Sequence, residues 1–447
     1  NKEDKHVSFP RMTAAASAAA LLFTGATPAQ QTGPTRVGVQ DPLNGRVLAV
    51  DGAGSGSASA NAFNPALSVL LDGVYKNTFS GHPEAPAGFA NDHDHDHEHG
   101  DSHGLEDGFN LRETEIALSA SVDSYFDAIA IVAVDGDSIE MEEAYFTTRS
   151  LPAGLQIKAG KFLSDIGYIN SQHPHDWDFV DRPLMSEVIF GDHGLQETGV
   201  QLSWVPPTPF YSRFGIEALQ GTNQGVSRYK GEDDDLGLER AKGPRLFTAF
   251  ARFAPDLGYN HAVQFGLSGG HASTWQAGEE HGSGRLEAWD GTAWFAGADL
   301  VYRYDAGRGH GHGDWKLQAE YVYREIDLDY AEDDGGAITS FSDRSRQDGT
   351  YLQAVYGIAP RWNAGLRAEA VGMTNRSVEP GNGGFETFDP SYRYSAQVTF
   401  KPTEFSRLRL QTSYADYAVD DDHHGDGAWT AMLQYTMSLG AHGAHGF

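Results

Sequence analysis

The chain has 447 residues, of which 62 are acidic and 32 are basic, so its formal net charge is −30. This charge argues against nucleic acid as a partner, because a phosphate backbone is bound by clustered Lys and Arg, and it favours cations as ligands. The chain has no cysteine, which excludes disulfides, thiolate metal sites and cysteine nucleophiles.

Residues 1–29 are predicted to be an export signal. Basic residues precede an apolar run from Met12 to Phe23, and residues 27–29 supply the small side chains that signal peptidase requires. Residues 30–63 are rich in Gly, Ser, Ala and Asn, which indicates a flexible periplasmic lead-in. Beyond the signal no apolar stretch reaches the roughly 20 residues of a membrane helix. We therefore expect no helical membrane span.

The rest of the chain alternates apolar and polar residues with period two. In residues 292–305, for example, Trp294 and Leu300 share one face while Asp299 and Arg303 share the other. One face suits lipid and the other suits water. We predict sixteen strands, at residues 64–75, 108–121, 123–134, 140–150, 154–163, 195–205, 210–221, 243–254, 259–271, 291–305, 313–328, 347–358, 361–374, 390–401, 404–417 and 427–439.

The connections between these strands alternate between tight turns and long segments. A soluble β-sandwich also shows period two, but it does not explain this alternation, which is typical of outer-membrane barrels with periplasmic turns and surface loops. We therefore predict an all-β fold, a transmembrane antiparallel β-barrel of about 16 strands over residues 64–439, surrounded by bacterial outer-membrane lipid. A C-terminal tail follows at 440–447. The long and mostly acidic connections are expected at 76–107, 164–194, 222–242, 272–290, 329–346, 375–389 and 418–426.

A dense array of imidazoles and carboxylates lies in the connection 76–107, which the topology makes the first surface loop. Neighbouring imidazoles two residues apart in an extended chain are roughly 6.6–7 Å apart, too far to share one zinc ion without a bend. We interpret the array as a mobile multi-site chelator; a solvated acidic loop and a pH sensor are the alternatives. Zinc is the favoured ion, although Cu²⁺ and Ni²⁺ would bind too. The candidate ligands are His93, Asp94, His95, Asp96, His97, His99 and His103.

The connection 164–194 is long enough to fold into the lumen as a constriction, and it carries a second set of candidate residues. In one interpretation it binds a metal that the surface loop hands over, through His173, His175, Asp176 and His193. In a second, its carboxylates pair with a basic wall as a structural constriction and create a field across the pore. The third alternative is an ordinary surface loop. The pore-lining candidates are Asp178, Asp181, Arg303, Arg324, Arg367, Arg393, Arg407 and Arg409.

Three stretches together resemble the zinc-regulated outer-membrane receptor family: Lys161–Leu184, Phe190–Leu195 with Gly199–Trp204, and the ending Ser438–His445. The resemblance covers most of the chain from Asn64 onward, and it implies a zinc-linked outer-membrane barrel. Members are often labelled TonB-dependent, which implies energised uptake. Such receptors combine about 22 strands with a folded plug, whereas residues 30–63 are too few to form one, so the chain departs from that label.

These observations predict an outer-membrane channel or receptor that captures divalent metal, with zinc favoured, at the His/Asp-rich surface loop and admits it to the periplasm. A periplasmic metal carrier is an expected partner, and His442 and His445 in the tail are placed to pass metal to it. We expect no organic cofactor and no enzyme activity, and the sequence leaves the oligomeric state open. The alternatives are a general or anion-selective porin with incidental metal binding, and a surface metal buffer that transports nothing.

Overall fold

The computed structural model describes most of the predicted barrel. The surface His array, from His93 to His103, and residues 441–447 of the tail lie outside the described residues, as do the predicted signal and the whole predicted lead-in. The described residues are 65–81, 85–89, 105–135, 138–280, 284–334, 337–379, 384–419 and 424–440.

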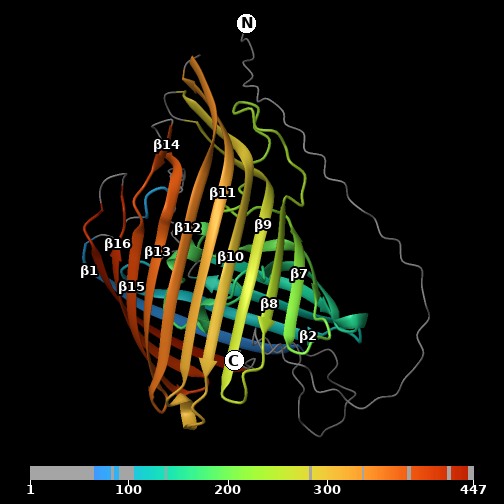
Figure 1. Ribbon diagram of the computed structural model, residues 1–447, viewed down its shortest axis with the longest axis vertical. Helices are drawn as coiled ribbons and strands as arrows, with labels where there is room; N and C mark the ends of the chain where they lie inside the picture. The colour runs from blue at the N-terminus through green and yellow to red at the C-terminus, as the bar shows by residue number, and fades with distance from the viewer. Residues whose placement is uncertain are drawn as a thin grey trace, which may run out of the picture.

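The strands form one closed antiparallel sheet (Figure 1). Consecutive strands pair with each other, and β1 also pairs with β17, which closes the wall. The short β14 pairs only with the end of β13, while β13 pairs directly with β15, so sixteen strands make up the wall within the described residues. The predicted barrel is confirmed.

The bounds of the strands follow the alternating segments of the sequence. They are β1 (Ala66–Ser80), β2 (Gly108–Ser121), β3 (Phe126–Asp135), β4 (Ser138–Thr148), β5 (Leu155–Leu163), β6 (Gln196–Trp204), β7 (Tyr211–Leu219), β8 (Leu246–Ala254), β9 (His261–Glu280), β10 (Leu286–Tyr304), β11 (Trp315–Asp334), β12 (Ala337–Ala359), β13 (Trp362–Glu379), β14 (Gly384–Thr387), β15 (Ser391–Thr403), β16 (Ser406–Asp416) and β17 (Ala428–Gly440).

The two faces of the wall differ as the alternation predicts. On β10, Trp294 and Leu300 are 38% and 48% exposed on the outer face, whereas Asp299 is 6% exposed on the inner face. On β17, Leu433 and Tyr435 point outward while Gln434 is fully buried. An apolar exterior with polar groups inside is the arrangement that a lipid bilayer requires of a barrel.

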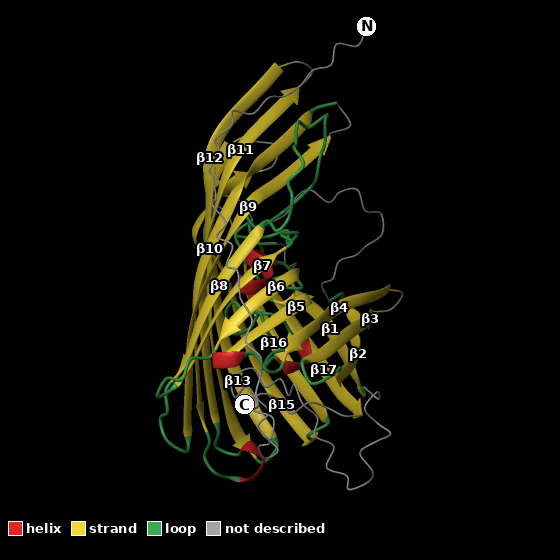
Figure 2. Ribbon diagram, turned by 90° about the vertical axis from the view of Figure 1, so that its right-hand side faces the viewer, coloured by secondary structure: helices red, strands yellow, loops and turns green. Residues whose placement is uncertain are grey.

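Strands β9 to β13 run much further than expected and rise above their neighbours at the end away from the short turns (Figures 1 and 2). The predicted loop 329–346 was wrong in its extent, because β11 continues to Asp334 and β12 begins at Ala337. Loops 272–290 and 375–389 are likewise largely strand. Aromatic contacts between neighbouring strands stabilise these extensions: the ring centroids of Trp289 and Tyr330 are 5.3 Å apart.

The helical elements of the described residues are short. Three are 3-10 turns, and one is an α-helix inside the long connection between β5 and β6. They are η1 (Pro152–Gly154), η2 (Pro174–Asp176), α1 (Leu184–Phe190) and η3 (Gly309–Gly311). None of the described helices is long and apolar enough to cross a membrane.

Candidate functional site

The connection from Ser164 to Leu195, here called the lumen segment, lies inside the barrel and contacts strands all around the wall. At its start, Asp165 forms an ion pair with Arg213 on β7 at 2.9 Å. In its middle, the backbone N–H of Val180 donates to Gln411 on β16 at 2.6 Å. Its apolar side chains, including those of α1, form much of the buried core. The lumen segment is therefore a packed insert, fixed by polar contacts on many sides.

Much of the predicted basic wall holds this segment in place. Arg367 contacts the Asp181 carboxylate at 2.5 Å, and Arg393 contacts the same group at 3.4 Å. Arg409 donates to the Trp177 carbonyl at 2.9 Å, and Arg324 donates to the Ile189 carbonyl at 3.2 Å. The guanidinium groups of these four arginines are therefore engaged by the lumen segment.

The opposite side of the lumen segment faces an acidic wall made by β2 and β4. Glu115 is on β2, and Glu142 and Glu143 are adjacent on β4. Adjacent residues of a regular strand point to opposite faces. Here a β-bulge shifts the pairing of β3 with β4, so that Ile131 faces Glu143 and Val132 faces Met141. The extra residue turns both carboxylates inward, where Glu142 is 6% and Glu143 is 0% exposed.

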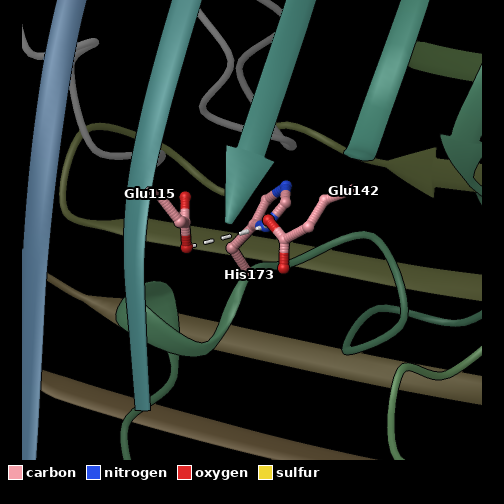
Figure 3. A group of neighbouring side chains, drawn as sticks. All are labelled: Glu115, Glu142 and His173. Atoms are coloured by element: carbon pink, nitrogen blue, oxygen red, sulfur yellow. Dashed lines mark ion pairs between the residues drawn. The ribbon is translucent and has the colours of Figure 1, made fainter. Parts of the chain in front are cut away.

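His173 lies at the centre of these carboxylates (Figure 3). Its Nδ1 is 3.4 Å from Glu142 Oε2 and 3.8 Å from Glu115 Oε1. Its Nε2 is 3.2 Å from Glu143 Oε2, and the other oxygen of Glu143 accepts a hydrogen bond from Leu163 N at 2.8 Å. Glu142 Oε2 is buried and accepts no hydrogen bond from the part of the chain that the structure describes.

His175 adds a second imidazole to the group. Its Nδ1 is 2.9 Å from Glu115 Oε1, and its Nε2 is 3.7 Å from Asp176 Oδ2. The rings of His175 and His173 are stacked, with centroids 5.7 Å apart. His173 is the extended residue before the 3-10 turn at Pro174–Asp176, and His175 lies within that turn. We call Glu115, Glu142, Glu143, His173 and His175 the lumen cluster.

The carboxylates of the lumen cluster favour protonated imidazoles. Burial opposes the charge on His173, but the nearby carboxylates of Glu115, Glu142 and Glu143 outweigh it, so the pKa of His173 lies well above its usual value. For His175, burial is again outweighed, here by Glu115 and Asp176, and its pKa is raised to about 9. The carboxylates of the cluster therefore favour positive charge at both imidazoles.

The lumen cluster also has the donor geometry of a divalent metal site. One atom each from Glu115, Glu142 and His173 lie within 4.8 Å of one another. Zinc binds imidazole nitrogen and carboxylate oxygen at about 2.0–2.2 Å, so ligand atoms around one ion are roughly 3–4 Å apart. Glu143 contacts Nε2 of His173, the ring nitrogen that does not face Glu115 and Glu142. A metal-ligating imidazole commonly binds a carboxylate through its second nitrogen in this way. One imidazole with two carboxylates suits a zinc-like ion better than Ca²⁺ or Mg²⁺, which prefer oxygen ligands alone.

Among the residues predicted for a metal site, His173, His175 and Asp176 lie together in the structure. His193 does not belong to the group of possible ligands, Glu115, Glu142 and His173, that is found among the described residues. Glu115, Glu142 and Glu143 were not predicted as ligands. The sequence contained one signal for them, since adjacent glutamates in an expected strand cannot both alternate regularly between lipid and lumen.

The remaining predicted pore residues lie on the side of the lumen toward the short turns. Asp178 pairs with Lys316 at 2.7 Å, where burial opposes ionisation but Lys316 outweighs it and lowers the pKa of Asp178 to about 2. Arg303 donates to the Tyr168 hydroxyl at 3.0 Å. Arg407 donates to the Thr436 hydroxyl at 3.3 Å, and its Nε is buried.

A protein of Aquifex aeolicus (strain VF5), described as uncharacterized, is 32% identical to this chain over 404 residues, which cover 87% of this chain and 81% of the relative. The outer membrane channel DcaP of Acinetobacter baumannii has 12% identity and a TM-score of 0.51, over 83% of this chain and 97% of DcaP. Pseudomonas putida OprB has 11% identity and a TM-score of 0.45, over 84% and 94% of the two chains. No protein-family model matches. The likeness to DcaP shows the fold of an outer-membrane barrel.

Proposed function

The chain belongs to the same family as the Aquifex aeolicus protein and folds as an outer-membrane β-barrel, and on this basis we propose that it is a channel that admits divalent metal, with zinc as the favoured ion, to the periplasm. The lumen cluster carries the proposal. It is the place where the segment crossing the lumen meets the acidic wall. His173 Nδ1 lies 3.4 Å from Glu142 Oε2 and 3.8 Å from Glu115 Oε1, within the roughly 3–4 Å expected between two ligand atoms of one zinc ion.

The sequence supports the same proposal in two ways. The run Lys161–Leu184, which resembles the zinc-regulated receptor family, contains both His173 and His175. The surface array from His93 to His103, outside the described residues, would collect metal above the barrel mouth. In this proposal the array concentrates the ion and the lumen cluster selects it, and a periplasmic carrier removes it on the other side.

Zinc entry into liposomes tests the proposal directly. The full chain is reconstituted with a zinc-sensitive dye inside the vesicles, and zinc binding is measured separately by calorimetry. We expect His173→Ala to weaken binding at least about 100-fold, since removing even a supporting residue of a metal site typically costs 10–100-fold. Glu142→Gln keeps the shape of the side chain and is expected to act in the same direction, because it removes a charged ligand.

The matched control is His261→Gln, an exposed histidine at the start of β9 whose ring contacts Tyr302. It should leave zinc binding and zinc entry unchanged. A deletion of residues 92–103 separates collection from selection, because it should lower entry at low zinc concentration and preserve binding at the lumen cluster. Equal zinc binding by the wild type and both lumen variants would overturn the proposal.

A general porin is the second candidate function, and the charges of both signs that line the lumen favour it. In that case zinc entry would occur without saturation and would match that of Mg²⁺. Saturating zinc entry that depends on His173 would decide for the metal channel. Zinc entry that is indifferent to the lumen variants and linear with concentration would decide for the porin.

A further inference from the structure

Cationic side chains gather at the short-turn end of the lumen, on strands far from the lumen cluster in sequence. Arg409 on β16 lies opposite Thr399 on β15, and both are buried on the inner face. Lys401 and Arg407 occupy the next inward positions on these two strands, beside the turn that joins them. Lys316, at the start of β11, interacts electrostatically with Lys401, as do Arg407 and Arg409. We call Lys316, Lys401, Arg407 and Arg409 the cation cluster.

The four members of the cation cluster differ in how their donors are used. Arg409 is fully engaged, since its three nitrogens donate to Thr399, Gln434 and the Trp177 carbonyl. Lys316 is paired with Asp178. Arg407 donates from one terminal nitrogen to Thr436, and its buried Nε has no acceptor among the described residues. An unsatisfied buried donor on a charged group is costly, and such donors are typically completed by a partner.

The carboxylates near Arg407 do not cancel the positive charge of the cluster. Asp72, Asp176 and Asp178 are its electrostatic neighbours, together with the further cation Arg112. Asp72 is engaged by Arg112 and by Gln434, and Asp178 is engaged by Lys316. Like charges on adjacent strands repel each other. An added anion would therefore be stabilised by the side chains of Lys401 and Arg407.

We propose that Lys401 and Arg407, supported by Arg409, bind a small oxyanion of the carboxylate or phosphate class at the short-turn end of the lumen. The planar guanidinium of Arg407 presents its Nε and a terminal nitrogen side by side, which matches two oxygens of one such anion. Lys401 adds a mobile charge at the solvent-exposed rim. This site needs no metal, so it goes beyond the proposed function and stands or fails independently of it.

Block of the channel current tests this site. The full chain is placed in a planar bilayer in potassium chloride that has been freed of metal by passage over a chelating resin, and potassium succinate or potassium phosphate is added on the short-turn side. A comparison of succinate with phosphate shows whether the site binds the carboxylate or the phosphate class of oxyanion. We expect the half-blocking concentration of at least one of them to rise by about tenfold or more in the double variant Lys401→Gln with Arg407→Gln, since charge-assisted hydrogen bonds are lost.

The control is Arg240→Gln with Arg308→Gln, which removes the same charge from two exposed arginines on connections outside the wall. It should leave the half-blocking concentration unchanged. Because a loss of Arg407 could disturb folding, Lys401→Gln alone and Arg407→Lys are measured as well: the first should weaken block and the second should retain most of it. Block by neither anion in the wild type, or equal block in the wild type and the double variant, would overturn the proposal.

Discussion

The two sides of the lumen contact the lumen segment through groups of opposite charge. On the side of β10 to β16, arginines donate to carbonyls and carboxylates at separate points along the lumen segment, although the buried Nε atoms of Arg324 and Arg407 have no acceptor among the described residues. On the side of β2 and β4, three carboxylates converge on one residue, His173. The first side anchors the lumen segment at many places, whereas the second gathers its acceptors around one imidazole. Charge alone does not distinguish an anchor from a candidate metal site; the arrangement of the charged groups does.

Removing the insert is the strongest test of this contrast. If residues 171–192 are replaced by a short Gly-Ser linker, we expect the single-channel conductance in potassium chloride to rise roughly fivefold or more, because an empty barrel of sixteen strands leaves an aqueous channel. Circular dichroism checks that the wall is intact. An unchanged conductance in a folded barrel would show that the lumen segment does not limit the current.

A smaller change should loosen the anchoring side alone. Asp181→Asn removes one carboxylate partner of two buried arginines, Arg367 and Arg393, and we expect it to lower the free energy of unfolding by about 2 kcal/mol, because charge-assisted hydrogen bonds are lost while Glu369 still pairs with both arginines. Urea unfolding in lipid vesicles measures the change. Asp192→Asn, an exposed position on the same segment, is the control. Zinc binding should persist in both variants, and equal losses of stability in the two would contradict the anchoring role of Asp181.

On the ligand side, Glu143 is predicted to act through His173. Glu143→Gln should weaken zinc binding by about 10- to 100-fold, as expected for a carboxylate that orients a metal-ligating imidazole. Calorimetry measures the affinity, and the unfolding free energy shows whether the barrel is otherwise affected. Glu140→Gln is the matched control on the same strand, because Glu140 is half exposed and pairs with Lys161 at the surface. An equal loss of zinc affinity in both variants would show that the loss comes from removing negative charge in general, and not from the contact between Glu143 and His173.

Low pH should weaken one contact that anchors the lumen segment, the pair of Asp178 with Lys316, within a defined pH range. The pKa of Asp178 is lowered from 3.8 to about 2, so its ionised form stabilises the folded state above pH 3.8, and this contribution is lost as the pH falls through about 2. The shift corresponds to about 2 kcal/mol at most. We expect current fluctuations of the open channel to increase between pH 4 and 2. In Lys316→Gln the increase should begin nearer pH 4; identical profiles would contradict the role of the Lys316 pair.

The barrel could be predicted from the sequence because the residue pattern that specifies its strands is local. Period-two alternation depends only on neighbouring residues, and it placed every strand of the wall. The extent of β9 to β13 was missed because polar residues replace apolar ones above the lipid, so the alternation fades while the hydrogen-bonded pairing continues.

The candidate site could be predicted only in part. His173 and His175 could be named as candidate metal ligands by residue type, but their partners Glu115 and Glu142 come from strands distant in the chain, and a β-bulge decides that Glu142 faces inward. The pairing of the lumen segment with a basic wall could be proposed from charge, but the individual contacts of the arginines could not. Whether Arg409 faces water or a carbonyl depends on the path of the lumen segment, which no local pattern encodes.

The way in which the insert is held affects how this family can change over time. The lumen segment begins at the end of β5 and ends at the start of the adjacent strand β6. These two strands pair without interruption from Leu155 to Leu163 of β5. Arg252 donates to the carbonyls of Asp165 and Gly167, and Arg324 donates to another backbone oxygen. Such contacts do not depend on which side chain the lumen segment carries at these positions. Substitutions there can thus accumulate without loosening these contacts, while the membrane-spanning wall keeps its own sequence.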